Sequence, residues 1–214
     1  MELTILYETD DKVVCIKPQG VESEHQLPAL LREQLGCFAV YPVHRLDKET
    51  GGVMVFAKTK SAAAELSRQA QDGRMQKTYL AVVNGIPKEP HGRWEDLLFR
   101  DRAKNKSYVV KRERKGVKTA SLSYEVLAEA RLNEQAVSLV RITLHTGRTH
   151  QIRAQFSARG HSLLGDRRYG GTVAANMALW AYQLCLEEQG EKKSFTAAPP
   201  SEDGWTVFGN GNFE

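Results

Sequence analysis

The chain has 214 residues, of which 41% are hydrophobic, and it carries a formal net charge of +4 at pH 7. This hydrophobic content suffices for a sizeable core and excludes an intrinsically disordered chain. No run approaches the roughly 18 apolar residues of a membrane span, and the short acidic start MELTILYETDD lacks the basic region of a signal peptide, so we expect a cytoplasmic protein.

The first part of the chain shows strand patterns interrupted by short helices. Residues 3–20 predict two short strands around a polar turn, and the second strand ends at a Pro and a Gly. Residues 26–36 predict a helix closed by glycine, and residues 52–59 predict a strand that is apolar on both faces and therefore central. Residues 59–73 predict a helix with Thr59 as its N-cap.

The remainder of the chain is rich in alternating apolar and polar residues. It predicts strands at 76–85, 119–130 and 136–147, a loop at 86–94, a helix at 148–160, an apolar run at 177–188 and a loose tail at 196–204. Strands outnumber helices, and several neighbouring strands lack helical crossovers. The pattern favours an α+β fold with a largely antiparallel, mixed central sheet and flanking helices and loops.

The charge is unevenly distributed along the chain. Residues 100–118 contain nine Lys and Arg against two acidic residues, a net charge of +7, whereas the rest has 21 bases against 24 acids. A basic stretch on a mildly acidic body indicates either a polyanion partner or a solvated basic loop.

The stretch YPVHRLDKETGGVMVFAKT, residues 41–59, places Asp47 beside two cations and then turns into an apolar run. A lone Asp in such a turn is most often structural. Its HRLD letters are similar to a kinase loop, but the spacing differs and the other kinase motifs are missing. Phosphate-binding glycine loops precede a helix, whereas Gly51 and Gly52 precede a predicted strand, so they indicate a phosphate site only weakly.

Metal binding is not indicated by the sequence. His145 and His150 are separated by a Gly break and do not share a helix face. Cys15, Cys37 and Cys185 are odd in number and far apart in the sequence, which is typical of buried thiols rather than of a disulfide framework or a metal cluster. We therefore expect no metal site.

Four blocks, in this order, resemble the RluA-type pseudouridine synthases. They are VVCIKPQGV, HRLDKETGG, KTYLAVVNG, and TGRTHQIR leading into GDRRYG. The chain departs from the family pattern in two places: relatives often have Ser where Gly51 stands, and they tend to have His where Trp180 precedes Ala. The resemblance implies a single catalytic domain over residues 1–214, without the accessory N-terminal RNA-binding module of many relatives.

The activity that this resemblance implies is the conversion of uridine to pseudouridine in structured ribosomal or transfer RNA, without a cofactor. The target base must be flipped out of its stack. Asp47, Tyr79 and Arg153 match the family's catalytic positions. Asp47 would act as an ionised carboxylate, either as a nucleophile or by removing a ribose proton. Tyr79 would stack on the flipped base, and Arg153 would pair with Asp47.

Further residues are expected to bind the substrate. Ile152 would close the base pocket, Arg45 would contact phosphate or fill the gap left by the base, and His44 would support the loop. Arg148 belongs to the same block as Arg153, and Lys111 and Arg112 belong to the basic stretch.

Two other classes of protein remain open, a binding protein that keeps the fold and an unrelated basic enzyme such as a phosphotransferase. We expect a monomer, and the sequence does not identify which RNA or which uridine is the target.

Overall fold

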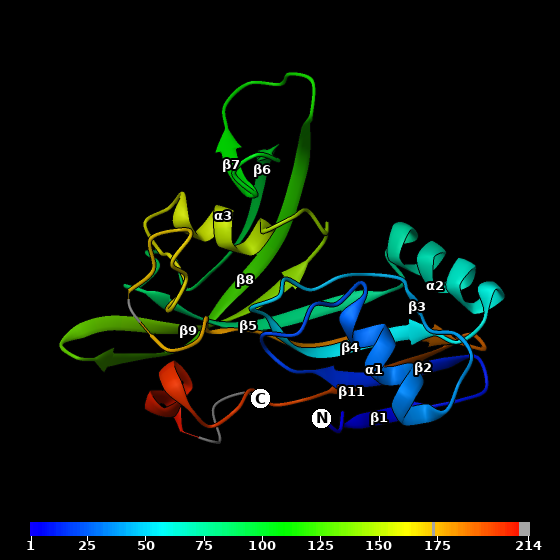
Figure 1. Cartoon of the computed structure of the whole chain (residues 1–214). Helices are drawn as coiled ribbons and strands as arrows, with labels where there is room; N and C mark the ends of the chain where they lie inside the picture. Colours follow the sequence, from blue (N-terminus) through cyan, green and yellow to red (C-terminus); the bar gives the residue numbers. More distant parts are fainter. Residues whose placement is uncertain (173, 210–214) are drawn as a thin grey trace. The chain divides into compact units, whose positions relative to one another are not determined.

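A computed structural model describes residues 1–172 and 174–209 of the chain (Figure 1). The chain divides into two compact units. The first comprises Met1–Thr78 and Trp180–Pro199, and the second comprises Tyr79–Leu179 together with the chain from Pro200 onward. The expectation of a single catalytic domain stays a prediction.

The first unit is built on a mixed sheet in which β1, β2, β4 and β10 lie side by side, with β3 paired to β4 and β11 paired to β10. Pairing is antiparallel except between β4 and β10, which run parallel where Gly51 and Gly52 face Trp180 and Ala181. The strands are β1 (Ile5–Glu8), β2 (Lys12–Lys17), β3 (Tyr41–Pro42), β4 (Gly51–Ala57), β10 (Leu179–Glu188) and β11 (Glu191–Thr196).

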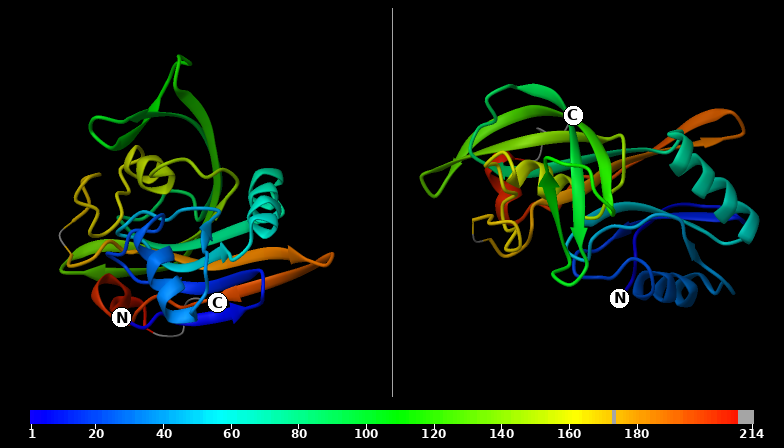
Figure 2. Two further views of the ribbon diagram at one scale, coloured as in Figure 1. Left: turned by 45° about the vertical axis from the view of Figure 1, so that its right-hand side comes forward. Right: turned by 90° about the horizontal axis from the view of Figure 1, so that it is seen from above.

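Two helices belong to this unit, α1 (Gln26–Leu35) and α2 (Lys60–Asp72). The Oγ1 of Thr59 accepts a hydrogen bond from the Ala62 amide at 3.2 Å, which caps the start of α2 as the sequence predicts. Helix α2 packs its Leu66 into a core formed by Val14, Val53, Val55 and Leu184. Figure 2 shows β10 and β11 as a long hairpin, in orange.

The second unit contains an antiparallel sheet in the order β5, β9, β8, β6 and β7. Helix α3 (Gln151–Ser157) packs against β6 and β7, as Figure 1 shows, and a short 3-10 helix follows at Asp203–Phe208. The chain enters this unit along β5, which begins in the first unit. The strands are β5 (Gln76–Asn84), β6 (His91–Asp101), β7 (Lys106–Val110), β8 (Val117–Leu132) and β9 (Gln135–Leu144).

These elements confirm the predicted α+β class, and they add strands that were not predicted and correct the start of one helix. Strand β6 was not predicted, and it begins at His91, inside the predicted loop 86–94. Strands β7 and β11 were not predicted either, because each is short and largely exposed on one face. Helix α3 begins at Gln151 rather than near Thr149, because His150 adopts a left-handed backbone with φ 52°. None of the helices described is long and apolar enough to cross a membrane.

Candidate active site

The loop that carries Asp47 is held by its backbone to the segment that follows β2. Residues 46–49 all accept hydrogen bonds through their carbonyl oxygens: Leu46 from Ser23 Oγ at 2.9 Å, Asp47 from the Thr50 amide at 3.0 Å, Lys48 from the Gly20 amide at 2.8 Å and Glu49 from Gln19 Nε2 at 2.9 Å. The Asp47 side chain is half-buried and takes no part in these backbone bonds. The backbone of this loop is therefore held at four successive residues.

Strand β4 begins with two glycines because β10 approaches closely there. A Cβ on Gly51 would lie 2.3 Å from the Trp180 ring, and a Cβ on Gly52 would lie 2.3 Å from the Ala181 carbonyl oxygen. Trp180 is buried and donates its Nε1 hydrogen to the Ala197 carbonyl at 2.8 Å. The two departures from the family pattern, Gly51 and Trp180, thus compensate each other in space, because the missing side chain makes room for the indole.

Lys17 is completely buried beneath the Asp47 loop. Its Nζ donates to the carbonyl oxygens of Pro18 at 2.8 Å and Lys48 at 3.1 Å. Burial lowers the pKa of the Lys17 ammonium to about 8, and the charge of Asp47 is the largest opposing influence. No role for Lys17 was predicted from the sequence, although it shares the strand phase of the buried Val13 and Cys15.

Changing Lys17 to Met is expected to alter how stability depends on pH. The Lys17 pKa is about 8 in the folded protein, against an ordinary value of 10.5. Between these values the unfolded chain binds the proton more tightly, so the wild type gains stability as pH rises and loses it as pH falls through 8. Denaturant unfolding of both proteins between about pH 7 and 11 measures the difference. A difference that stays flat across this window would contradict a buried, titrating Lys17.

His44 supports the same loop rather than carrying protons. Its Nε2 accepts a hydrogen bond from the Val55 amide at 3.2 Å, and its buried Nδ1 has no partner among the described residues. Burial holds the pKa of His44 well below its usual range, and the charge of Lys77 lowers it further. Lys77 is also poorly solvated, which lowers its own pKa to about 8. A neutral His44 fits the predicted supporting role.

Arg45, next to His44, is exposed and forms an ion pair with Glu24 at 3.2 Å. Exposed pairs of this kind contribute about 0–1 kcal/mol, so the guanidinium can exchange Glu24 for another anion at little cost.

In the second unit, Arg153 is a buried arginine on α3 that forms a two-pronged ion pair with Asp166. Its Nε donates to Asp166 Oδ2 at 2.7 Å and its Nη2 donates to Oδ1 at 2.8 Å. Both side chains are almost inaccessible to solvent. Asp166 also accepts hydrogen bonds from the backbone amides of Arg168 and Tyr169. No role for Asp166 was predicted from the sequence, and the predicted pairing of Arg153 with Asp47 stays a prediction.

Tyr169 links this ion pair to residues 97–119, which form the end of β6, strand β7 and the start of β8 and which we call the basic hairpin. The Arg153 guanidinium lies 5.2 Å from the centre of the Tyr169 ring. The Tyr169 hydroxyl accepts from the Ser107 amide on β7 at 2.7 Å and lies 3.1 Å from His150 Nδ1. The ring therefore joins the GDRRYG segment, the start of α3 and strand β7.

Tyr79 and Ile152 are both buried, with exposures of 6% and 4%. Arg148 is exposed, and its Nε donates to the Thr119 carbonyl at 2.9 Å.

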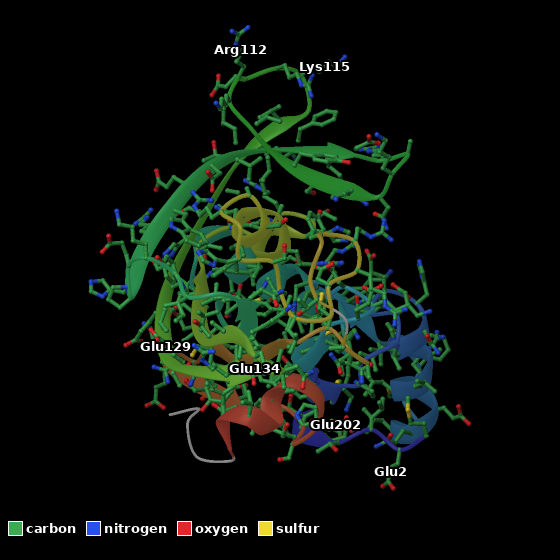
Figure 3. The ribbon with its side chains drawn as sticks, turned by 90° about the vertical axis from the view of Figure 1, so that its left-hand side faces the viewer. Glu2, Arg112, Lys115, Glu129, Glu134 and Glu202 are labelled. Carbon is green, nitrogen blue, oxygen red and sulfur yellow. The ribbon has the colours of Figure 1, made fainter. Side chains whose placement is uncertain are left out.

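The basic stretch forms the end of β6, strand β7 and the loop into β8. Figure 3 shows Arg112 and Lys115 at the tip of that loop, whereas Glu129 and Glu134 lie near the turn between β8 and β9, at the other end of β8. Eight of the nine cations are exposed, and Lys106 is half-buried. Within residues 1–172 and 174–209, none of the nine forms an ion pair with a carboxylate. Their charge is therefore available to an external anion.

The predicted site residues thus divide between the units. His44, Arg45 and Asp47 lie in the first, and Tyr79, Lys111, Arg112, Arg148, Ile152 and Arg153 lie in the second. Across the described residues, no group of three or more His, Cys, Asp or Glu side chains is placed to hold a metal ion.

Comparisons with known proteins extend these observations. A family model described as RNA pseudouridylate synthase matches residues 11–158. An uncharacterized RNA pseudouridine synthase of Aquifex aeolicus is 36% identical over 183 residues, which are 78% of this chain and 56% of that protein. The dual-specificity RNA pseudouridine synthase RluA of Escherichia coli is 36% identical over 210 residues, 94% of each chain. The chain thus spans little more than half of the first relative and nearly all of the second.

Solved structures agree with these matches. Human RNA Pseudouridylate Synthase Domain Containing 1 superposes with a TM-score of 0.82 and 27% identity over 93% of this chain and 84% of that one. Human RNA Pseudouridylate Synthase Domain Containing 4 shares the fold, with a TM-score of 0.76 and 24% identity over 92% of this chain and 88% of that one. The predicted family and fold class are confirmed. By its sequence and its fold, the chain belongs to the RluA-type family of RNA pseudouridine synthases, a family of isomerases.

Proposed function

We propose that this protein isomerises uridine in structured ribosomal or transfer RNA and that Asp47 is its essential catalytic residue. The observation that carries the proposal is the way in which the loop around Asp47 is held. Its loop is fixed through backbone hydrogen bonds, and the buried ammonium of Lys17 lies below it. A carboxylate on a loop whose backbone is held in this way is positioned to act on a bound substrate.

The chemistry requires the base to leave its stack, lose its bond to ribose through nitrogen, turn, and rejoin through carbon 5. The hydrogen of carbon 5 is released to solvent in the process. Tyr79 stacks on the extracted base, and Ile152 closes the other side of the pocket. Asp47 acts either as the nucleophile or as the base that removes a ribose proton, and both routes need its ionised form.

Three further groups orient the reaction or its substrate. Arg153 is held by its two hydrogen bonds to Asp166 and pairs with Asp47. Arg45 exchanges Glu24 for a phosphate or fills the gap left by the base. Arg148 contacts the substrate beside Thr119. Action without a cofactor or metal, as a monomer in the cytoplasm, remains part of the proposal.

The basic stretch supplies affinity and orientation. Changing Lys111, Arg112, Arg114 and Lys115 to Gln is expected to flatten the slope of log affinity against log salt, by about 0.7–0.9 for each phosphate that the protein no longer neutralises. The apparent Michaelis constant should rise, while the rate at saturating RNA stays near that of the wild type, because the four side chains lie on an exposed loop. Salt titrations of binding and single-turnover rates measure both quantities. An unchanged slope would show that the loop does not touch RNA, and a collapsed saturated rate would place it in the active site.

The RNA target is tested in cells. Pseudouridines are mapped across cellular RNA in a strain that lacks this protein and in the same strain supplied with wild-type protein or with Asp47→Asn. The proposal expects specific sites in ribosomal or transfer RNA to disappear and to return only with the wild type. An unchanged map would contradict the proposed substrate, and rescue by Asp47→Asn would contradict the proposed residue.

A further inference from the structure

One face of the basic hairpin carries apolar and aromatic side chains that face away from α3. On β7, Ser107 and Val109 point toward the packed side, where Val109 joins Leu98, Ala154 and Tyr169. Because strand side chains alternate, Tyr108 points to the opposite side. We call the residues of this opposite side the outer face; they are Leu97, Phe99, Tyr108, Val110, Val117 and Thr119.

The register aligns the outer face into adjacent rows. Phe99 lies opposite Tyr108 on one side and opposite Val117 on the other, and Leu97 lies opposite Val110 and Thr119. Tyr108 is 37% exposed on the edge strand β7, so part of its ring is open to solvent. A hollow of about 430 Å³ adjoins the rows, lined by Leu97, Glu113, Arg114, Val117 and Thr119.

A cation lies near each of the two rings. Arg114 lies 4.4 Å from the centre of the Phe99 ring. Lys106 lies 5.5 Å from the centre of the Tyr108 ring, while it also lies 4.7 Å from the Tyr169 ring and donates to the Arg168 carbonyl at 2.7 Å. Both cations belong to the stretch whose net charge is +7. Aromatic rings interleaved with cations are how proteins hold unstacked nucleobases, with the rings taking the bases and the cations taking the phosphates.

We infer that the outer face is a stacking platform for an unpaired nucleobase of the RNA, separate from the base that is isomerised, with Tyr108 as its exposed ring. This inference rests on the proposed RNA substrate and adds a base contact to a segment to which the proposed function assigns affinity and orientation through phosphate contacts. Stacking reads no base identity, so the platform selects single-stranded or looped RNA over duplex.

Charge decides between the possible occupants of this face. An apolar protein surface would have to cover Lys106 and Arg114 beside the rings without compensating their charge, whereas RNA brings a phosphate with every base. A nucleic acid therefore satisfies both the rings and the charges at the same time.

The test compares Tyr108→Ala with Tyr108→Phe on two ligands, a single-stranded oligouridylate and heparin, which is a polyanion without bases. Tyr108→Ala is expected to weaken oligouridylate binding by about 5- to 150-fold and to leave both heparin binding and the salt slope unchanged. Tyr108→Phe keeps the ring and should bind as the wild type does. An equal loss on both ligands, or no loss on either, would overturn the platform.

A second measurement does not depend on the fold of a variant. Oligouridylate that contains 5-iodouridine is irradiated on wild-type protein, and the attached peptide is identified by mass spectrometry. Attachment at Tyr108 or Phe99 is expected, and attachment that spares residues 97–119 would refute the inference. A change in oligomeric state on Tyr108→Ala, with RNA binding unchanged, would instead assign the face to a protein contact.

These outcomes are separable from those of the proposed function. If the wild type releases no tritium from uridine labelled at carbon 5 but Tyr108 is still attached to the probe, the proposed isomerisation fails and the platform stands. If tritium is released and Tyr108→Ala binds the probe normally, the platform alone fails.

Discussion

Replacing Asp47 with Asn or Ala is expected to abolish isomerisation, with rates falling to below about one thousandth of the wild-type rate. Asparagine keeps the size of the side chain but is neither a base nor a nucleophile, so both routes open to Asp47 are lost. The fold should survive, because the backbone carbonyls of residues 46–49 hold the loop through hydrogen bonds of their own. RNA affinity should stay near normal, since the basic stretch is untouched.

Glu49→Gln is the matched control for this experiment. Glu49 lies on the same loop, carries the same charge and also acts electrostatically on Lys17. It should keep most of the activity, because it does not occupy the family's catalytic position. Tritium release and filter binding are measured on all three variants. Appreciable release by Asp47→Asn, or equal loss in Glu49→Gln, would show that the loop needs negative charge rather than the Asp47 carboxylate.

Replacing Arg153 with Met is expected to have two large effects that a single variant cannot separate. Activity should be lost, because Asp47 loses its proposed partner. Stability should also fall, by about 3–5 kcal/mol, because a buried carboxylate at Asp166 is left without its cation. Equilibrium unfolding in denaturant measures the second effect.

The double variant Arg153→Met with Asp166→Asn separates the two roles. Removing both charges should recover much of the lost stability, since no buried charge is left unpaired. Activity should stay low, because the proposed partner of Asp47 is still missing. A double variant with wild-type activity would show that Arg153 serves only to neutralise Asp166.

The predictable parts of the fold are those in which one face of an element is buried. The all-buried strand β4 and the capped helix α2 have strong apolar patterns, and both lie where the sequence places them. Strands β7 and β11 lack such a pattern, because β7 has five residues with the apolar Tyr108 and Val110 on its outer face, and β11 is mostly polar. Their pairing depends on neighbouring strands, which local patterns do not encode.

The candidate site was predictable only where chemistry and motif coincide. Asp47, Arg153 and Asp166 all stand in motif positions, but the ion pair between Arg153 and Asp166, thirteen residues apart, is a contact that spacing does not predict. Lys17 left a usable signal, because it continues the buried phase of β2. The outer face left none until the register of β6, β7 and β8 aligned Phe99, Tyr108 and Val117.

The central claim is that this protein breaks the bond between ribose and a uracil nitrogen in RNA and forms a bond between ribose and carbon 5 of the same base. The most direct measurement is tritium release from RNA whose uridines are labelled at carbon 5, taken from cells that lack the protein and incubated with purified wild type. We predict a burst of tritium that reaches a plateau set by the number of target uridines, with an equal number of pseudouridines in the digested RNA. RNA that is bound tightly by the protein but keeps all of its tritium would contradict the claim and leave a binding protein with the fold of an enzyme.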